Sequence, residues 1–337
     1  MKRISITDIA RELDITPSTV SRALNGEPRI SKKTRTSVLK LARQWGYWPD
    51  ILAERFASRK TYNIGLIIPE FTHHFFHQVM RGIESFVVPK GYHLIICTSD
   101  NEYEKEKKSV QTLLDVGVDG FLVALGDNLQ SYEHFQDIFS LEIPLVFIDR
   151  TYKDIEASYV STSDIEGASQ ATEHLISVGC RQIVYIQGPT HISTAIDRFT
   201  GYQQALKKAQ IPFQQKYVID GSQAQELGKK LAAVLQRHPV DAVFAHNDNL
   251  AYEAMQFLQQ QGRQVPRDIL VMGYDNEPIS RLVTPQLSTV QQPAFVMGQR
   301  SADLLIQQLE SGYFNKDLLT QNIPTSLVLR ESTSRGC

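Results

Sequence analysis

Three polar side chains follow apolar runs at points where parallel strands would end. Asp149 follows LVFI, Asn247 follows VFAH and Asp275 follows VMGY. Ligands of open α/β sheets bind outside the carboxyl ends of the strands, where carboxylate and amide groups can hydrogen-bond a polar molecule. Each residue alone would more often close a loop or cap a helix. The three are therefore candidates for a ligand site at the strand ends.

A second set of chemically active residues lies in the first 60 positions, which hold 13 Lys and Arg against 6 Asp and Glu. This head has a net charge of +7 and the remainder −9, because the whole chain carries −2. Arg, Lys and short hydroxyl side chains are the groups that contact phosphates and base edges. The head therefore predicts nucleic-acid binding, with a small helical bundle that has no such role as the alternative.

Sequence signals divide this head into three helices. Ser5 with Asp8 predicts the start of the first helix, Thr16 before Pro17 the second, and Ser31 the third. Two short helices joined by a tight turn, with a third for support, are typical of a helix-turn-helix unit. The second helix of such a unit enters the major groove of DNA.

From residue 63 onward, apolar runs typical of strands alternate with amphipathic helical stretches. The runs are NIGLIIPE, YHLIICTSD, DGFLVAL, IPLVFID, RQIVYIQGP, KYVIDG, DAVFAHND and ILVMGYD. This alternation predicts parallel sheets covered by helices on both faces, in two similar lobes that divide near residues 159–164. LSTVQQP and QNIPTSLVLRE are expected to pass back between the lobes.

Composition excludes several classes of protein. Hydrophobic residues at 42% and charged residues at 21% are ordinary for globular chains, and no apolar run reaches the length of a membrane span. The amino terminus lacks the apolar core of a signal peptide, and three widely spaced cysteines do not form a disulfide or zinc pattern. We expect a cytoplasmic protein with no membrane partner and, without a heptad tail, no coiled-coil tetramer.

The run TDIARELDITPSTVSRALNGEPRISKKTRTSVLKLARQWGYWPDILAERFASRKT, followed by NIGLIIPE, resembles the LacI family of bacterial regulators, most specifically at TVSRALN and GYWPD. The resemblance extends over essentially the whole chain. It implies an all-α helix-turn-helix head joined by a hinge helix to an α/β two-lobed type I periplasmic-binding-protein-like core. The implied divisions are 1–48 (DNA binding), 49–61 (hinge) and 62–337 (effector binding and dimerisation), with an N-lobe of about 62–161 and 291–322 and a C-lobe of about 162–290 and 323–337.

The resemblance places base-reading side chains on the second helix, at Pro17, Ser18 and Arg22. A guanidinium can bond O6 and N7 of a guanine together, so Arg22 is predicted to specify a base pair. In the hinge, Phe56 matches a leucine that wedges into the minor groove, and simple packing against the dimer mate is the alternative. Other head residues are expected to contact DNA phosphates or to cap helices: Ser5, Thr7, Thr16, Thr19, Ser21, Asn25, Ser31 and Arg35.

The resemblance also makes Asp149, Asn247 and Asp275 effector ligands. From the segment GPTHISTAIDRFTGYQQAL it adds Arg198, with Thr194 nearby. Carboxylates, an amide and a guanidinium suit a neutral polyhydroxylated ligand such as a sugar, with a nucleobase as the alternative.

The first strand-to-helix loop, PEFTHHFFHQVM, is expected to put Phe75 or Phe76 against the ligand. His74 stands where the family usually has proline, which leaves the shape of this loop open. His73 and His77 could in principle hold a metal ion, but a surface cluster at a helix start is favoured because no acidic or thiol partner is evident.

The predicted function is that of a sequence-specific DNA-binding transcriptional regulator, a repressor by resemblance, that binds a palindromic operator as a homodimer under the control of a small effector. A solute-binding protein of a transporter and an enzyme are the rivals. The basic head opposes the first. Against the second, GSQAQELGKK lacks the spacing of a phosphate loop and GASQA lacks the last glycine of a nucleophile elbow, so neither catalysis nor a cofactor is expected. Whether the effector releases or strengthens DNA binding stays open.

Overall fold

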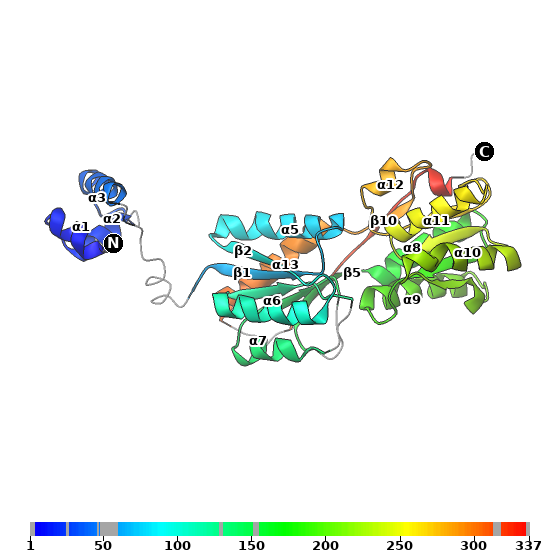
Figure 1. Cartoon of the computed structure of the whole chain (residues 1–337), viewed down its shortest axis with the longest axis horizontal. Coiled ribbons are helices and arrows are strands. Elements are labelled where there is room, and N and C mark those ends of the chain that lie inside the picture. Colours follow the sequence, from blue (N-terminus) through cyan, green and yellow to red (C-terminus); the bar gives the residue numbers. More distant parts are fainter. Residues whose placement is uncertain are drawn as a thin grey trace. The chain divides into compact units, whose positions relative to one another are not determined.

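The computed structural model describes residues 4–24, 27–45, 47, 60–127, 131–150, 155–312 and 318–334. The chain forms two compact units, Met1–Thr61 and Tyr62–Cys337. Figure 1 shows the first as three short helices and the second as two α/β lobes, which confirms the predicted fold class. Residues 48–59, which include Phe56 and nearly all of the expected hinge, lie outside the described residues, as does Asn25.

The head contains the three predicted helices α1 (Ile6–Glu12), α2 (Pro17–Leu24) and α3 (Lys32–Gln44). The predicted caps are present, because the hydroxyls of Ser5, Thr16 and Ser31 each accept a hydrogen bond from a backbone N–H three residues on. Each cap satisfies a donor that the first turn of a helix otherwise leaves free. The helices pack on a small core made of Ile9, Ala10, Val20, Ala23, Val38 and Ala42.

Six parallel strands form the sheet of the first lobe, here called the N-lobe, in the order β11-β5-β4-β3-β1-β2. Their bounds are β1 (Asn63–Ile68), β2 (His93–Thr98), β3 (Gly120–Val123), β4 (Leu145–Ile148), β5 (Ser158–Thr162) and β11 (Thr320–Ile323). β1 is buried along its whole length, whereas β2 lies at one edge and is partly exposed. Parallel strands buried on both faces account for the continuous apolar runs of the sequence.

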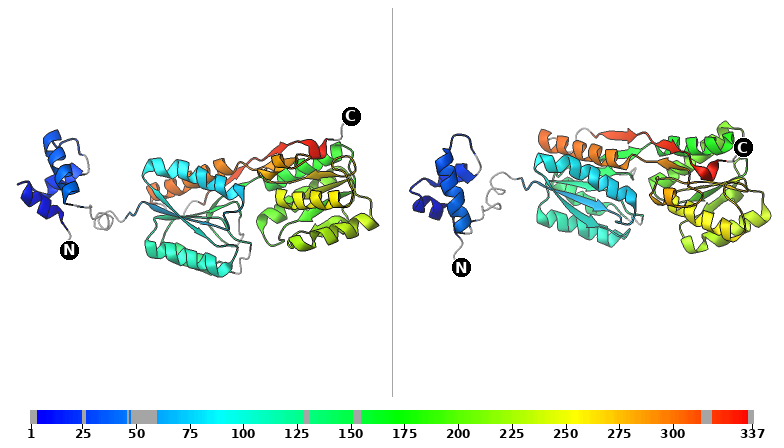
Figure 2. Two further views of the ribbon diagram at one scale, coloured as in Figure 1. Left: turned by 45° about the horizontal axis from the view of Figure 1, so that its top comes forward. Right: turned by 90° about the horizontal axis from the view of Figure 1, so that it is seen from above.

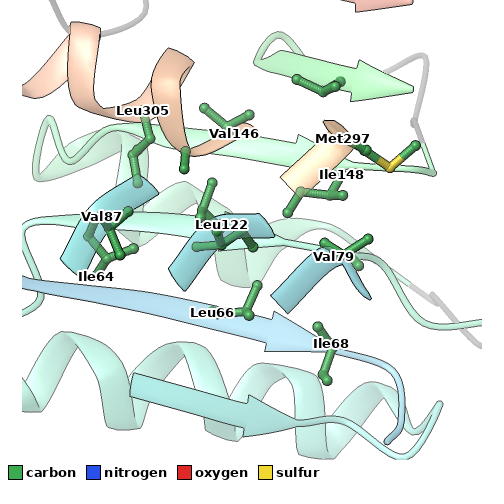
Figure 3. Close-up of a cluster of buried hydrophobic side chains, with 14 of the residues drawn as sticks. Ile64, Leu66, Ile68, Val79, Val87, Leu122, Val146, Ile148, Met297 and Leu305 are labelled. Atoms are coloured by element: carbon green, nitrogen blue, oxygen red, sulfur yellow. The ribbon is translucent and has the colours of Figure 1, made fainter. Parts of the chain in front are cut away.

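Helices cover both faces of this sheet (Figure 1). α5 (His74–Val87) and α13 (Ala294–Ser311) lie on one face, and α6 (Tyr103–Val116) and α7 (Gln136–Ser140) lie on the other. Figure 3 shows the core under α5 and α13, where Leu66, Leu122 and Val146 from three neighbouring strands meet Val79 and Met297 from the helices.

The second lobe, here called the C-lobe, has a parallel four-stranded sheet in the order β7-β6-β8-β9. The strands are β6 (Ile183–Gln187), β7 (Val218–Asp220), β8 (Ala242–Ala245) and β9 (Leu270–Met272). α8 (Asp164–Ser177) and α9 (Ser193–Lys208) pack on one face, and α10 (Ala224–Arg237) and α11 (Asp248–Gln260) pack on the other. The short helix α12 (Ile279–Leu282) follows β9.

The chain passes between the lobes three times, after β5, after β10 (Thr289–Gln291) and between β11 and β12 (Ser326–Val328). β10 and β12 pair antiparallel on the C-lobe side. Figure 2 shows the last passage in red, at the carboxyl-terminal end of the colour scale. Three short passages beside one another allow the lobes to change their angle without unfolding either sheet. None of the described helices is both long enough and apolar enough to cross a bilayer.

Two glycines let α5 and α13 cross at close range. A Cβ added at Gly298 would lie 2.1 Å from the carbonyl oxygen of Val79, and one at Gly82 would lie 2.1 Å from that of Phe295. Both obstacles are backbone atoms, so only a shift of a whole helix could relieve the clash. Glycine is therefore required at this crossing for space.

We expect Gly298→Ala to lower the free energy of unfolding by about 2 kcal/mol or more, because overpacking a rigid contact costs about 1–3 kcal/mol. Gly228→Ala is the matched control, since Gly228 also lies inside a helix and its nearest obstacle is the side chain of Phe257 at 3.0 Å. There the helix propensity gained by alanine, about 0.5–1 kcal/mol, should offset the contact. Urea unfolding of both variants checks this, and equal stabilities would contradict it.

Candidate ligand and DNA-binding sites

A cleft of about 280 Å³ lies between the lobes at the carboxyl ends of their strands. Both lobes line it, which agrees with the rule that ligands bind at strand ends in open α/β sheets. The structure brings all seven predicted effector residues to this cleft: Phe75, Phe76, Asp149, Thr194, Arg198, Asn247 and Asp275. Both phenylalanines are buried and form part of the N-lobe core.

The guanidinium of Arg198 lies at the base of the cleft and is only 4% exposed. Its Nε donates to Asp164 Oδ1 at 2.9 Å, and one terminal nitrogen donates to the carbonyl of His246 at 2.8 Å. The same nitrogen lies 3.4 Å from Asp275 Oδ1, and the guanidinium carbon lies 3.8 Å from the centre of the Tyr274 ring. Burial by itself lowers the pKa of Arg198, but the neighbouring carboxylates raise it above its ordinary value. The group is therefore a permanent cation.

Two carboxyl groups in the cleft have raised pKa values. Burial raises the pKa of Asp149 to about 7, although the charge of Arg150 lowers it. Burial likewise raises the pKa of Asp275 to about 6, against the charge of Arg198. Both residues have positive φ angles, 69° at Asp149 and 104° at Asp275. Strained backbone and desolvated charge at one place are typical of a functional site.

Asn247 has both of the roles that its sequence position allowed. Its side-chain oxygen accepts from the backbone N–H of Leu250 at 2.9 Å, which makes it the N-cap of α11. The same side chain lines the cleft. Because capping uses its oxygen, the amide nitrogen is the group that remains for a ligand.

The histidines at the start of α5 have separate partners. His73 Nε2 lies 3.2 Å from Glu70, which raises the pKa of His73, and this contact helps to lower the pKa of Glu70 to about 2. His74 Nε2 lies 3.0 Å from the amide nitrogen of Gln78. Within the described ranges, no three His, Cys, Asp or Glu side chains are grouped so that they could hold a metal ion.

In the head, α2 presents Pro17, Ser18 and Arg22 to solvent. The Arg22 guanidinium is held loosely, with Nε 3.9 Å from Glu27 Oε2 and the side chain 60% exposed. Arg35 instead donates to the carbonyl of Glu27 at 2.6 Å and is half-buried. The remaining polar residues of the predicted set that the structure describes lie at or near the surface: Ser5, Thr7, Thr16, Thr19, Ser21 and Ser31.

Residues 5–50 match the model of the lacI family of bacterial regulatory proteins, and residues 172–333 match that of a periplasmic binding protein-like domain. Over 336 residues the chain is 33% identical to a ribose operon repressor of Halalkalibacterium halodurans, with 98% of each chain covered. The chain belongs to the lacI family. It is thus a DNA-binding transcriptional regulator controlled by a small-molecule effector, and its relatives are repressors rather than enzymes.

Solved structures of the lacI family are similar over most of this chain. The lac repressor dimer bound to operator and an anti-inducer has a TM-score of 0.82 at 26% identity, with 98% of this chain and 99% of that chain covered. A lacI family regulator from Enterococcus faecium with bound ribose has a TM-score of 0.70 at 28% identity, with 81% of this chain and 98% of that chain covered.

Sequence reasoning missed several polar residues of the cleft region, and three of them have well-defined partners. Arg150 lines the cleft, pairs with Asp127 at 2.5 Å and donates to the Leu125 carbonyl at 2.7 Å. Gln292 lines it too and donates to Asp275 at 2.7 Å, while Asp164 accepts a hydrogen bond from Arg198. All three residues follow the end of a strand, and this position was the sequence signal that could have identified them. For Asp164 and Gln292 the strands are β5 and β10, whose sequences SYVST and TVQ lack a long apolar run.

The raised pKa of Asp149 predicts how pH changes stability. An unfolded Asp has a pKa of about 3.9, so the folded chain binds the proton more tightly. Protonation of Asp149 therefore stabilises the folded chain fully below about pH 4, and this contribution is lost as pH rises through about 7. Asp149→Asn cannot carry the buried charge. Its free energy of unfolding minus that of wild type should therefore be larger at pH 8 than at pH 4, on the order of 1–4 kcal/mol.

Urea unfolding of wild type and Asp149→Asn from pH 4 to pH 8 measures this difference. Asp115→Asn is the control, because Asp115 is exposed on α6. A wild-type and Asp149→Asn difference that does not change with pH would show that Asp149 titrates normally.

Proposed function

We propose that the chain is a repressor that binds a palindromic operator as a homodimer in the cytoplasm, and that a neutral sugar controls it. The effector residues are those that line the cleft, and D-ribose is the first candidate effector. The observation that carries this proposal is the convergence of aromatic, carboxylate, amide and guanidinium groups from both lobes on one cleft. The protein acts by binding and not by catalysis.

Two polar atoms in the cleft that make no hydrogen bond support a ligand with neighbouring hydroxyl groups. Asp149 Oδ1 and Arg150 Nε are buried and have no hydrogen-bond partner among the described residues, although Nε lies 3.9 Å from Asp149 Oδ2 in an ion pair. A buried polar atom without a partner costs about 1–3 kcal/mol. A hydroxyl can donate to the carboxylate while its neighbour accepts from the guanidinium, so a pair of adjacent hydroxyls satisfies both atoms.

The size and charge of the cleft favour a neutral monosaccharide. Its volume of about 280 Å³ is at the lower end of ligand sites, which span about 300–1,000 Å³. Four acidic side chains line it, Glu70, Asp127, Asp149 and Asp275, against Arg150, Arg198 and His73. The cleft therefore offers no excess of positive charge to a phosphorylated sugar. The ribose operon repressor among the relatives and the ribose-bound structural neighbour further support a pentose.

Exposed apolar groups support a dimer. The edge strand β2 presents Ile96, which is 41% exposed, and α12 presents Leu282, which is 80% exposed. Open strand edges and large exposed apolar side chains are features that a second chain covers. Two heads related by a two-fold axis would read two half-sites of a palindrome.

Selection of operators from a random duplex pool tests the regulator. We expect a palindrome to be enriched and its affinity to fall steeply with salt. Arg22→Ala should remove discrimination at one base pair of each half-site, by about 1–3 kcal/mol. Arg11→Ala, which changes an exposed residue on α1, serves as the control. A uniform loss of affinity for all sequences with Arg22→Ala would make this residue a phosphate contact instead.

Titration with D-ribose tests the effector site. We expect wild type to bind ribose and to change its operator affinity. Asp149→Asn should weaken ribose binding by about 100-fold or more, because an amide cannot replace a charged acceptor inside the cleft. Operator affinity without sugar should stay as in wild type. Since the variant is expected to be more stable, loss of sugar binding could not be ascribed to unfolding.

Wild-type affinity for ribose should also rise as pH increases through about 7, because hydroxyl donors favour the ionised form of Asp149. Absence of ribose binding, with binding of another neutral monosaccharide, would correct the effector but keep the site. Binding only of nucleobases would overturn the sugar proposal.

A further inference from the structure

One side chain of the C-lobe reaches across to the helix that carries the aromatic wall of the cleft. The two carboxylate oxygens of Glu277 accept hydrogen bonds from the backbone N–H groups of His74 and Phe75, each at 3.1 Å. These two N–H groups open the first turn of α5, in the N-lobe. Glu277 is 8% exposed and is not among the residues that line the cleft.

The first turn of α5 depends on this contact. Its N-cap residue, His73, makes no side-chain capping bond. The first N–H groups of a helix have no partner within the helix and carry a partial positive charge. A carboxylate that accepts from two of them is therefore a strong, charge-assisted cap. Here the other lobe supplies the cap.

The loop that carries Glu277 is held firmly within the C-lobe. The backbone N–H of Glu277 donates to Asp248 Oδ2 at 2.8 Å, and Asp248 Oδ1 accepts from the Thr289 hydroxyl at 2.6 Å. Asp248 is fully buried, and a Cβ at Gly273 would lie 2.1 Å from its Oδ1. The loop is thus fixed from one side, and the carboxylate of Glu277 extends from a rigid base.

The same short loop carries Asp275, two residues before Glu277, and the same first turn of α5 carries Phe75 and Phe76. The bond between Glu277 and α5 thus joins a proposed polar ligand of one lobe to the aromatic wall of the other. Because the bond joins one lobe to the other, a movement that separates the lobes would break it. A residue that stabilises the closed arrangement raises the affinity for any effector that needs both lobes, because the apparent affinity depends on the population of the competent state.

We propose that Glu277 is a positioning residue for the effector site, a cross-lobe cap that couples lobe closure to effector binding without touching the effector. This inference rests on the proposed function for the effector site and for the identity of the sugar. Its physical core is the bond between Glu277 and the first turn of α5.

Three variants test the inference in the full-length protein. Glu277→Ala removes the cap. Glu277→Gln keeps the size but leaves one acceptor oxygen and no charge, and Glu277→Asp keeps the charge with shorter reach. Glu226→Gln is the matched control, because Glu226 is an exposed first-turn glutamate of α10 that lies near Lys230 in its own helix.

Two measurements are made on each variant. Amide hydrogen exchange of His74 and Phe75, without sugar, reports the bond directly, and we expect it to be at least about 5-fold faster in Glu277→Ala than in wild type. Calorimetry with D-ribose reports coupling, and we expect affinity to fall about 10-fold in Glu277→Ala and Glu277→Gln, within the usual range of coupling. Glu277→Asp should recover part of it, and Glu226→Gln should match wild type in both readouts.

Equal exchange of the two amides in wild type and Glu277→Ala would overturn the inference, as would unchanged ribose affinity in Glu277→Gln. A fall in affinity that tracks a lowered melting temperature in every variant, the control included, would reduce Glu277 to a stabilising residue and also overturn it. If wild type does not bind ribose, the effector proposal fails separately, and the exchange rates then decide the role of Glu277.

Discussion

The buried guanidinium of Arg198 is the constraint on which the two-lobed body depends. A charge removed from water is tolerated only when counter-charges and hydrogen bonds surround it. Asp164 at the start of α8, Asp275 after β9 and the His246 carbonyl after β8 supply these partners. They come from three different strand ends, so the charge can be satisfied only when the C-lobe sheet and the first passage between the lobes are correctly placed. The face of Tyr274 completes the enclosure.

Burial of these charged groups in the cleft also lowers the free energy of unfolding of the protein. More carboxylates than cations surround the space, and burial raises the pKa of Asp149 and Asp275 instead of letting both ionise freely. A site arranged to exchange hydrogen bonds with a ligand holds unsatisfied groups until that ligand arrives. Stability and recognition are therefore opposed at the same atoms, as is common where binding needs preorganised polar groups. The packed cores on both faces of each sheet supply the stability that this arrangement requires.

Much of the fold and of the cleft was predictable from the sequence. In a parallel α/β sheet the residue after an apolar run lies at the carboxyl end of a strand, where ligands bind. Asp149 and Asp275 were found in that way, and the helix caps of the head follow from short polar side chains before apolar periods. Asp164 was missed because its strand, SYVST, is short and polar at alternate positions. The contact of Glu277 with α5 could not be predicted at all, since it depends on how two separately folded sheets face each other, which no local pattern encodes.

The attachment of Tyr62 to the N-lobe offers a physical link between effector binding and DNA binding. Tyr62, just before β1, is fixed to the N-lobe, because its N–H donates to Asp119 and its carbonyl accepts from His93, both at 2.7 Å. The segment that precedes it therefore starts from a fixed point on the N-lobe. A ligand that draws the lobes together turns the N-lobe relative to the C-lobe about the three passages. In the proposed homodimer, that rotation would change the separation of the two Tyr62 residues, and two heads that read the two half-sites of a palindrome depend on that separation. A small change of angle would then change operator affinity, because the two half-sites of one operator have a fixed spacing.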